Sequence, residues 1–595
     1  MTLACFVPVA VFGVCARFMA IPDVLCKSPD ELSELMPGLR LHALPILNIH
    51  DGIRNNFIQS MFFSTHGLGD VSFYYLSSSV LSLLGLPMSE RFLYAAGGVT
   101  NLAMALAGGI LGARLLGSAG SGWIFAMLTL ASPYFVFISK SGWARLTWTP
   151  LLLLLLFLSQ WKAMRDRGAI WTAVFVLLGG FISLTDGLVM LPIMLVSAVL
   201  IAEGRLADRL KQLTRDRVFL CALAAVAIGF GLELLIGLEA RRRGTSLTLI
   251  GYVLYKGGQA SLLPSFDVLA AWTRCVDFYF PFRGAWLLVT CACLLAAWEG
   301  IRGRMIGFIA AWWLLASLGL TRYMTQRTDI GWLNAYQLVV PSYLLVAWLI
   351  ASIAEGRLPF ARHIPAAVRG ALAMALLLPL TALMLLQANT VAFASEPAHG
   401  VTIGQLVGGT PAQLRKCHAV KAAAFYVRAH ATGRPYVFHV SSDVPLGYIG
   451  EFYYGLSRAG SRRPEEANHL FDFGLNQFHR KYPPSAFYRA YGVEHFDYYV
   501  DVIDEADPLK TETLIQLSEQ GARVVCTIRD GDRPIGRVFS FHDEPPIDLD
   551  YHTAAAEWER TFAHPRTLFL DRLTGTSYFF GDNWKAPEER PSPPR

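Results

Sequence analysis

Charged residues are scarce in this chain of 595 residues. Asp, Glu, Lys and Arg make up only 16% of it, whereas soluble globular proteins carry about 25%. Hydrophobic residues reach 54%, and the mean hydropathy is +0.40. This balance indicates a polytopic membrane protein. The net charge of +6 is small for the size, and no basic stripe with interleaved aromatic residues is present, so we expect no nucleic-acid partner.

The sequence also lacks the common signatures of zinc and nucleotide sites. No CxxC pair precedes a His pair, so a structural zinc site is not indicated. The glycine-rich stretches "GGVTN" (97–101) and "LGSAGSG" (116–122) have no Lys-Ser/Thr ending, which excludes a P-loop. Of the nine cysteines, Cys417 and Cys526 fall in the more polar last third. They could form a disulfide if that region lies in an oxidising compartment.

Long apolar segments dominate the first two thirds of the chain. About 20 apolar residues span a bilayer, and candidate spans lie near 3–21, 71–86, 93–116, 121–138, 147–161, 169–184, 187–202, 218–238, 284–299, 305–320, 333–352 and 366–388. Together they predict an α-helical polytopic membrane domain with about 11–13 spans over residues 1–395. Two polar loops, 22–70 and 239–283, interrupt it.

Charge on the connectors predicts orientation. The basic stretches 160–168, 203–217 and 355–363 are expected to face the cytoplasm, although they do not all agree with the span count. The first loop and the C-terminal region share a side only if an even number of spans separates them. The segments above place an odd number between them, so hydropathy leaves this point open.

The C-terminal region is soluble in character, and we expect a separate domain over 396–585 followed by a disordered tail, 586–595. The stretches 434–442, 497–504 and 522–530 are rich in β-branched and aromatic residues and predict strands. Residues 418–431 and 509–520 predict helices. Such alternation is typical of an α/β domain.

The stretch "NIHDGIRNNF" (48–57) contains the first candidate site. Asp51 and His50 precede an amphipathic segment in which apolar residues recur at helical spacing, as in a helix lying in the membrane interface. Asp51 is either a catalytic carboxylate held at headgroup depth or the N-cap of that helix. Composition does not separate these alternatives.

Further polar residues lie where other apolar segments begin or end. His66 and Asp70 precede the interfacial Tyr74, and each could serve function or simply solvate a loop. Lys140 and Arg145 flank a break between two apolar segments. They either snorkel to the interface or bind phosphate, for which the planar guanidinium of Arg is well suited. The polar residues Arg327 and Tyr336 precede or enter a late span.

In this order, the motifs resemble the GT-C superfamily of polytopic glycosyltransferases. The resemblance is to the bacterial branch similar to protein O-mannosyltransferases and to the enzyme that adds aminoarabinose to lipid A. It covers about 45–345 and is carried by the following elements, in chain order: "HDGIRNN" at Asp51, His66 to Tyr75-Leu76, Leu84-Gly85 to Arg91, "SKSGWAR" from Ser139 to Arg145, and Arg327, Tyr336 and Pro341. Gly52 departs from the family pattern, which often has Asp-Glu at the catalytic position, and "HGLGD" replaces its two prolines.

The resemblance implies inverting transfer of a sugar from a polyprenyl-phosphate donor to a glycan, lipid or protein acceptor outside the cytoplasm. Asp51 would be catalytic, and Lys140, Arg145 and Arg327 would bind the donor phosphate. Substrate contacts would come from His50, His66, Asp70, Tyr74 and Tyr336. No cofactor is predicted, and a divalent metal stays open. The implied location is the bacterial inner membrane, among membrane lipids, with the active site and C-terminal domain on the periplasmic side.

Two other classes of function are compatible with a polytopic chain. A flippase for lipid-linked sugars, or another transporter, often shows repeated halves; we find none here. A non-catalytic envelope assembly protein would act through its C-terminal domain. We therefore expect a transferase, with these two as alternatives.

Overall fold

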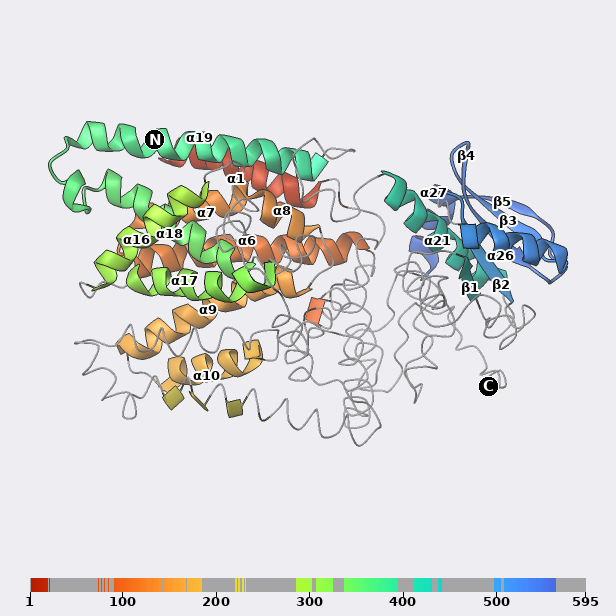
Figure 1. Ribbon diagram of the computed structural model, residues 1–595, viewed down its shortest axis with the longest axis horizontal. Helices are drawn as coiled ribbons and strands as arrows, with labels where there is room; N and C mark the ends of the chain where they lie inside the picture. The colour runs from red at the N-terminus through yellow and green to blue at the C-terminus, as the bar shows by residue number, and fades with distance from the viewer. Residues whose placement is uncertain are drawn as a thin grey trace.

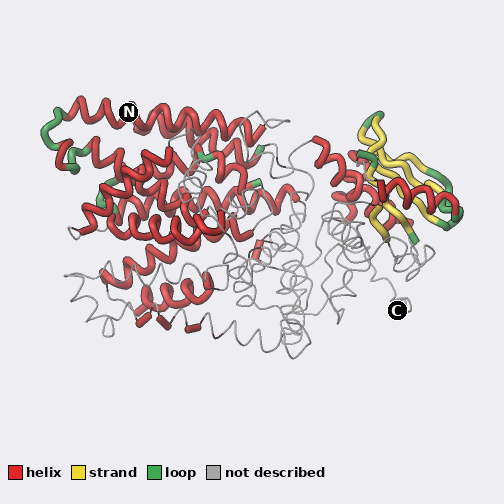
Figure 2. Tube along the Cα trace, viewed as in Figure 1, coloured by secondary structure: helices red, strands yellow, loops and turns green. Residues whose placement is uncertain are grey.

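The computed structural model describes a large part of the chain. The described residues are 2–19, 21, 73, 76–77, 80, 84, 90–140, 144–166, 169–183, 220–221, 223–224, 227–228, 231, 285–301, 306–324, 336–393, 411–430, 437–440, 497–504 and 508–562. Helices make up the first part and a small mixed sheet lies in the last (Figures 1 and 2). The predicted loops 22–70 and 239–283 and the tail 586–595 lie outside the described residues.

Helices occupy the apolar segments that hydropathy identified. They are α1 (Thr2–Phe18), α6 (Glu90–Leu115), α7 (Ala119–Ala131), α8 (Pro133–Ser139), α9 (Ala144–Asp166), α10 (Ala169–Ser183), α16 (Ala285–Ile301), α17 (Ile306–Met324), α18 (Tyr336–Ala354) and α19 (Ala366–Phe393), with the short 3₁₀ helix η6 (Pro359–Ala361) between the last two. The predicted span 187–202 lies outside the described residues, and so does the larger part of 71–86 and of 218–238.

Within the described part of the chain, 3 helices are long and apolar enough to cross a membrane: Tyr94–Arg114, Leu338–Ala361 and Ala366–Phe393. Helices α7 and α8 meet at a bend of 58°. They add a fourth candidate if the bent pair crosses the membrane as one span. The sequence predicted one continuous segment there, near 121–138. Pro133 explains the difference, since proline has no N–H to continue the hydrogen-bond ladder.

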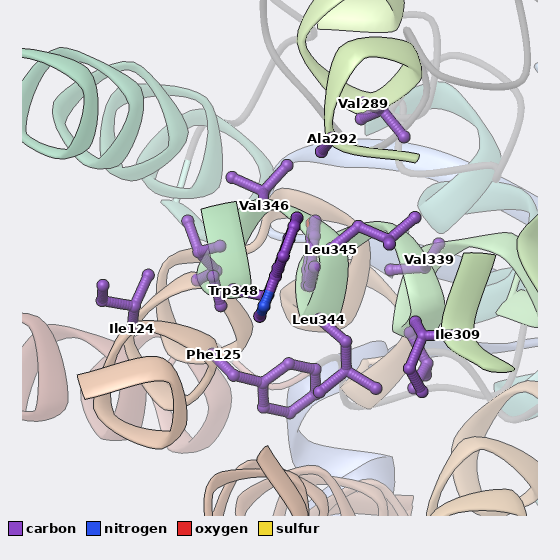
Figure 3. Close-up of a cluster of buried hydrophobic side chains, with 14 of the residues drawn as sticks. Ile124, Phe125, Val289, Ala292, Ile309, Val339, Leu344, Leu345, Val346 and Trp348 are labelled. Carbon is purple, nitrogen blue, oxygen red and sulfur yellow. The ribbon is translucent and has the colours of Figure 1, made fainter. Parts of the chain in front are cut away.

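Helix α18 is the centre of the helical domain. In the most apolar stretch of Leu338–Ala361, which contains most of α18, 83% of the residues are buried. Apolar side chains from α7, α16 and α17 converge on it, among them Phe125, Val289 and Ile309 (Figure 3). Buried apolar packing of this kind holds the neighbouring helices in one arrangement, and so determines which helix ends lie together.

The C-terminal region has the predicted α/β character. Its strands are β1 (Val437–Val440), β2 (Tyr498–Val502), β3 (Arg523–Asp530), β4 (Arg533–Ser540) and β5 (Ile547–Asp550), in the order β1-β2-β4-β3-β5. β1 pairs with β2, and β3 with β5, in parallel; β4 is antiparallel to both β2 and β3. Helix α21 (Pro411–His430) packs on β2, β3 and β4, while α27 (Tyr551–Phe562) contacts α21, β3 and β5, and α26 (Pro508–Glu519) contacts β1.

Three elements of the C-terminal domain were not predicted from the sequence: the strands β4 and β5 and the helix α27. Strand β4 contains Pro534 and Gly536, residues that are depleted in strands. Gly536 is needed because α21 approaches closely: a Cβ on this residue would lie 2.9 Å from the Cβ of Ala419. β5 is a short acidic strand with no clear apolar pattern. α27 is amphipathic, with Tyr551 and Ala554 buried, and it was not identified from the sequence.

The sequence left open whether Cys417 and Cys526 form a disulfide, and in the structure they do not. Both residues carry thiols and both are buried, Cys417 in α21 and Cys526 in β3. A buried thiol packs as a small apolar group, and burial raises the pKa of Cys526 to about 12. These cysteines therefore belong to the core of the sheet domain.

Candidate functional site

The structure describes only some of the predicted site residues. His50, Asp51, His66, Asp70, Tyr74 and Arg327 lie outside the described residues. Arg145 stands in the first turn of α9, and Tyr336 is the first residue of α18. Lys140 is the one member of the set whose side chain is described. The geometry of the candidate site therefore starts from Lys140 and from the helix ends around it.

Lys140 is a buried cation at the end of α8. It forms the C-cap of that helix and is only 4% exposed. Its Nζ donates hydrogen bonds to the carbonyl oxygen of Met19 at 2.7 Å and to that of Ala392 at 2.9 Å. Met19 follows α1 directly, and Ala392 is in the last turn of α19. One ammonium group thus joins the ends of three helices.

The charge of Lys140 suits this position. The last carbonyl groups of a helix have no donor within the helix, and its C-terminal end carries a partial negative charge of about half an elementary charge. Three such ends meet here. The ring of Phe393 lies beneath the ammonium, with its centroid 5.3 Å from Nζ, and adds a cation–π contact.

Helices α6 and α9 meet at the same place. A Cβ added to Gly97 of α6 would lie 3.0 Å from the carbonyl oxygen of Ser139 and 3.4 Å from Cγ2 of Thr147. The early part of α6 therefore packs against the end of α8 and the first half of α9. The end of α8, with Lys140, contacts the ends of α1 and α19 as well. We call this end of the helical domain the Lys140 end.

Helix α18 begins at the Lys140 end. The hydroxyl of Tyr343 lies 2.7 Å from that of Ser132, just before α8, whereas Glu355 bonds to Ser118 at the start of α7. α18 is therefore antiparallel to α7, and the helix begins, at position 336, at the Lys140 end.

Helix α17 runs toward the same end. Near its start, the ring of Phe308 is 5.0 Å from that of Phe157 in the second half of α9. Further along, Trp313 donates to Ser342 of α18 at 2.9 Å. Because α9 runs away from Lys140, α17 ends at the Lys140 end. Arg327 follows it in sequence, outside the described residues.

These contacts show which of two helix ends lie together. The ends of α1 and α19 are joined by one ammonium group, so both helices end at the same end of the helical domain. Hydropathy detects apolar length; it does not show whether each apolar segment crosses the membrane.

No described group of three or more His, Cys, Asp or Glu side chains could hold a metal ion; this statement covers only the described ranges. His50 and Asp51 are not among them. The two glycine-rich stretches have structural roles. Residues 97–101 are helical within α6, and 116–122 form the α6–α7 turn, in which Gly117 has a φ of 62°.

An apolar hollow of about 380 Å³ lies between α1, α6 and α7. Small residues such as Gly109 and Gly122 form part of it, with Phe6 and Trp123 on its sides. Among the described residues, none of those that line it is acidic or basic. It offers no group for acid–base chemistry and is distinct from the candidate site.

Comparison with known proteins gives structural matches. No family model matches the chain, and no curated protein matches it in sequence. ArnT from Cupriavidus metallidurans bound to undecaprenyl phosphate matches with a TM-score of 0.51 at 13% identity, over 92% of this chain and 99% of that one. Its apo form gives 0.49 at 14% identity over the same shares, and the apo Archaeoglobus fulgidus oligosaccharyltransferase gives 0.48 at 13% over 85% and 70%. The first of these shows that the chain has the fold of ArnT.

Proposed function

We propose that this protein is a membrane glycosyltransferase that moves a sugar from a polyprenyl-phosphate carrier to an acceptor at the Lys140 end. One observation carries the proposal: the helix ends next to the predicted site segments gather at this end. α1 leads toward Asp51, α9 begins beside Arg145, α17 leads toward Arg327, and α18 begins at Tyr336. The shared fold with a protein solved with undecaprenyl phosphate supports the same class of donor.

The chemistry follows from the residue types. Displacement at the anomeric carbon passes through an oxocarbenium-like state, and negative charge grows on the leaving lipid phosphate. Arg145 and Arg327 would stabilise that charge. Asp51 would accept the proton of the acceptor hydroxyl on the opposite face of the sugar, which gives inversion. His50, His66, Asp70, Tyr74 and Tyr336 would contact the substrates.

Connector charge supports an extracytoplasmic site. The basic stretch 160–168 includes the end of α9, and 355–363 follows α18; both helix ends point away from Lys140. Cytoplasmic connectors carry the excess of Lys and Arg. This favours a periplasmic position in a bacterial inner membrane for the Lys140 end and for the domain at 396–585, which follows α19.

Binding of undecaprenyl phosphate tests the donor part of the proposal. We expect the purified full-length protein in detergent to bind it, as measured by native mass spectrometry. Arg145→Ala should weaken binding at least roughly tenfold, because a charge-assisted bond is lost. Arg114→Ala is the matched control: Arg114 lies in the last turn of α6, at the other end of the domain. Equal affinity in all three proteins would refute the donor site.

Transfer itself is tested with Asp51→Asn. Proteoliposomes would contain undecaprenyl-phosphate hexoses and pentoses with radiolabelled sugars, together with envelope extract as acceptor. The wild type should move label from at least one donor to the acceptor, and Asp51→Asn should lose roughly 10²–10⁴-fold of that rate while it still binds the carrier. Full activity in Asp51→Asn would remove its catalytic role. Movement of intact labelled carrier across the bilayer, without transfer, would instead show a flippase.

A further inference from the structure

We infer that Lys140 is a positioning residue, which holds three segments of the site together, rather than a ligand of the donor phosphate. The expected effect on kinetics rests on the proposed function, but the contacts of Lys140 do not depend on that function. The sequence motif, in contrast, implies that this lysine binds the donor phosphate.

The surroundings of the Lys140 ammonium are those of a structural link. The residue is 4% exposed, and the Met19 and Ala392 carbonyl oxygens lie at 2.7 and 2.9 Å. The ring of Phe393 faces the same ammonium. A lysine that binds a phosphate acts as an accessible point charge with donors directed at the ligand. Here two donors already bond to the main chain.

The three linked segments lead to different parts of the proposed site. After Met19 the sequence continues toward Asp51. After Lys140 it reaches Arg145 within five residues. After Ala392 and the end of α19 it continues toward the C-terminal domain. Lys140 therefore fixes the relative positions of the three helix ends from which the chain continues to the proposed base, to the proposed phosphate ligand and to the sheet domain.

The link depends on both charge and donor number. Lys140→Met keeps a similar length and apolar stem but removes all N–H donors, so the carbonyl groups of Met19 and Ala392 lose the ammonium that bonds them. Lys140→Arg keeps the charge and supplies several donors. We expect methionine to release the helix ends and arginine to restore most of the link.

Hydrogen exchange of the full-length protein in detergent, without any ligand, tests the link directly. In Lys140→Met, amides in the last turns of both α1 and α19 should exchange roughly tenfold or more faster, since bonds to a charged group are lost. Amides at the start of α7 should not change. Lys140→Arg should stay close to the wild type. Lys162→Met is the matched control, because this half-buried lysine lies in the second half of α9.

Kinetics then separates positioning from binding. In Lys140→Met, the dissociation constant for undecaprenyl phosphate should stay within about twofold, while kcat falls roughly tenfold or more because the reacting groups are misplaced. Unchanged exchange at α1 and α19, together with a tenfold loss of carrier affinity, would overturn the inference and make Lys140 a phosphate ligand. If Lys140→Met does not accumulate, Lys140→Gln takes its place, since it is uncharged and shorter. The exchange result holds or fails whether or not sugar transfer is detected.

Discussion

Arg17 of α1 donates a hydrogen bond to the carbonyl oxygen of Thr129 in α7, at 2.9 Å. The same guanidinium reaches the carbonyl oxygens of Leu130 at 3.1 Å and Gly13 at 2.8 Å, and Arg17 is fully buried. The helix break explains this contact. Pro133 has no N–H to offer Thr129, and the N–H of Ser132 lies 3.4 Å from that oxygen. Arg17 supplies the missing donors.

Arg17→Met should therefore destabilise the helical domain. The substitution leaves two carbonyl groups at the end of α7 without their main donors. It also removes the cost of burying a charge, so we expect a net loss of about 2–4 kcal/mol. Thermal unfolding of the full-length protein in detergent measures it. Arg114→Met, at an exposed arginine of α6, should change stability by less than about 0.5 kcal/mol. Equal unfolding of both variants would contradict the role of Arg17.

Tyr343→Phe should weaken the contact between α18 and the same break. Its hydroxyl lies 2.7 Å from that of Ser132, and both residues are completely buried. Loss of one buried hydrogen bond should cost about 1–2 kcal/mol. Ser132→Ala should cost more, because Ser132 also accepts the N–H of Phe135 as the N-cap of α8.

A double-mutant cycle tests the pair. Ser132→Ala combined with Tyr343→Phe should be less destabilising than the sum of the two single changes, by about 1 kcal/mol. Strict additivity in thermal unfolding would show that the two hydroxyl groups do not interact.

Asp504 should make the sheet domain sensitive to acid. Burial of this carboxyl group acts to raise its pKa, but hydrogen bonds from Arg415 of α21 and Arg533 of β4, both at 2.7 Å, prevail and lower it. A group whose pKa is lower in the folded state stabilises that state above its unfolded pKa, near 3.9. That contribution is lost as the pH falls through the lowered folded pKa.

Asp504→Asn should thus destabilise the sheet domain at pH 7 by about 1–3 kcal/mol, and its difference from the wild type should shrink as the pH falls below about 4. Hydrogen exchange of β2 and β4 in the full-length protein, corrected for intrinsic rates, measures both. Asp543→Asn is the control. Asp543 is 99% exposed, and its ion pair with Arg523, at 3.5 Å, lies at the surface. A constant difference at all pH values would contradict the assignment.

Cys526 should be unreactive in the folded protein. Burial, with a smaller effect of Asp548, raises its thiol pKa to about 12, and only the thiolate reacts with electrophiles. N-ethylmaleimide at pH 8 should modify Cys526 only after unfolding, as seen by peptide mass spectrometry. A non-reducing digest should contain no peptide that joins Cys417 to Cys526. A linked peptide would restore the disulfide that the structure excludes.

Much of the fold was predictable from local patterns. Apolar length located α6, α9, α16, α18 and α19, and β-branched enrichment located β1, β2 and β3. β4 was not found, because Pro534 and Gly536 are poor strand residues and only the close packing of Ala419 explains the glycine. The break at Ser132 was also missed, although Pro133 accounts for it locally. The donors that satisfy its carbonyl groups come from Arg17, which is more than a hundred residues away.

The candidate site, too, was predicted in part from the sequence and decided in part by tertiary contacts. The order of polar residues at the ends of apolar segments was enough to suggest a resemblance to polytopic glycosyltransferases, and the structure has the fold of one solved protein, ArnT. Hydropathy could not decide whether α1 and α19 end at the same end of the helical domain, because counting segments ignores which segments cross. The contacts of Lys140 with Met19 and Ala392 decided it.

The sequence by itself determined which segments are apolar, where helices and strands form, and which residue types stand at their ends, because these depend on neighbours along the chain. Tertiary structure alone decided which ends meet and what each buried cation bonds to. The physical reason is that a buried charge must find its partners among groups nearby in space, and for Arg17 and Lys140 those partners are carbonyl oxygens that no local pattern reveals.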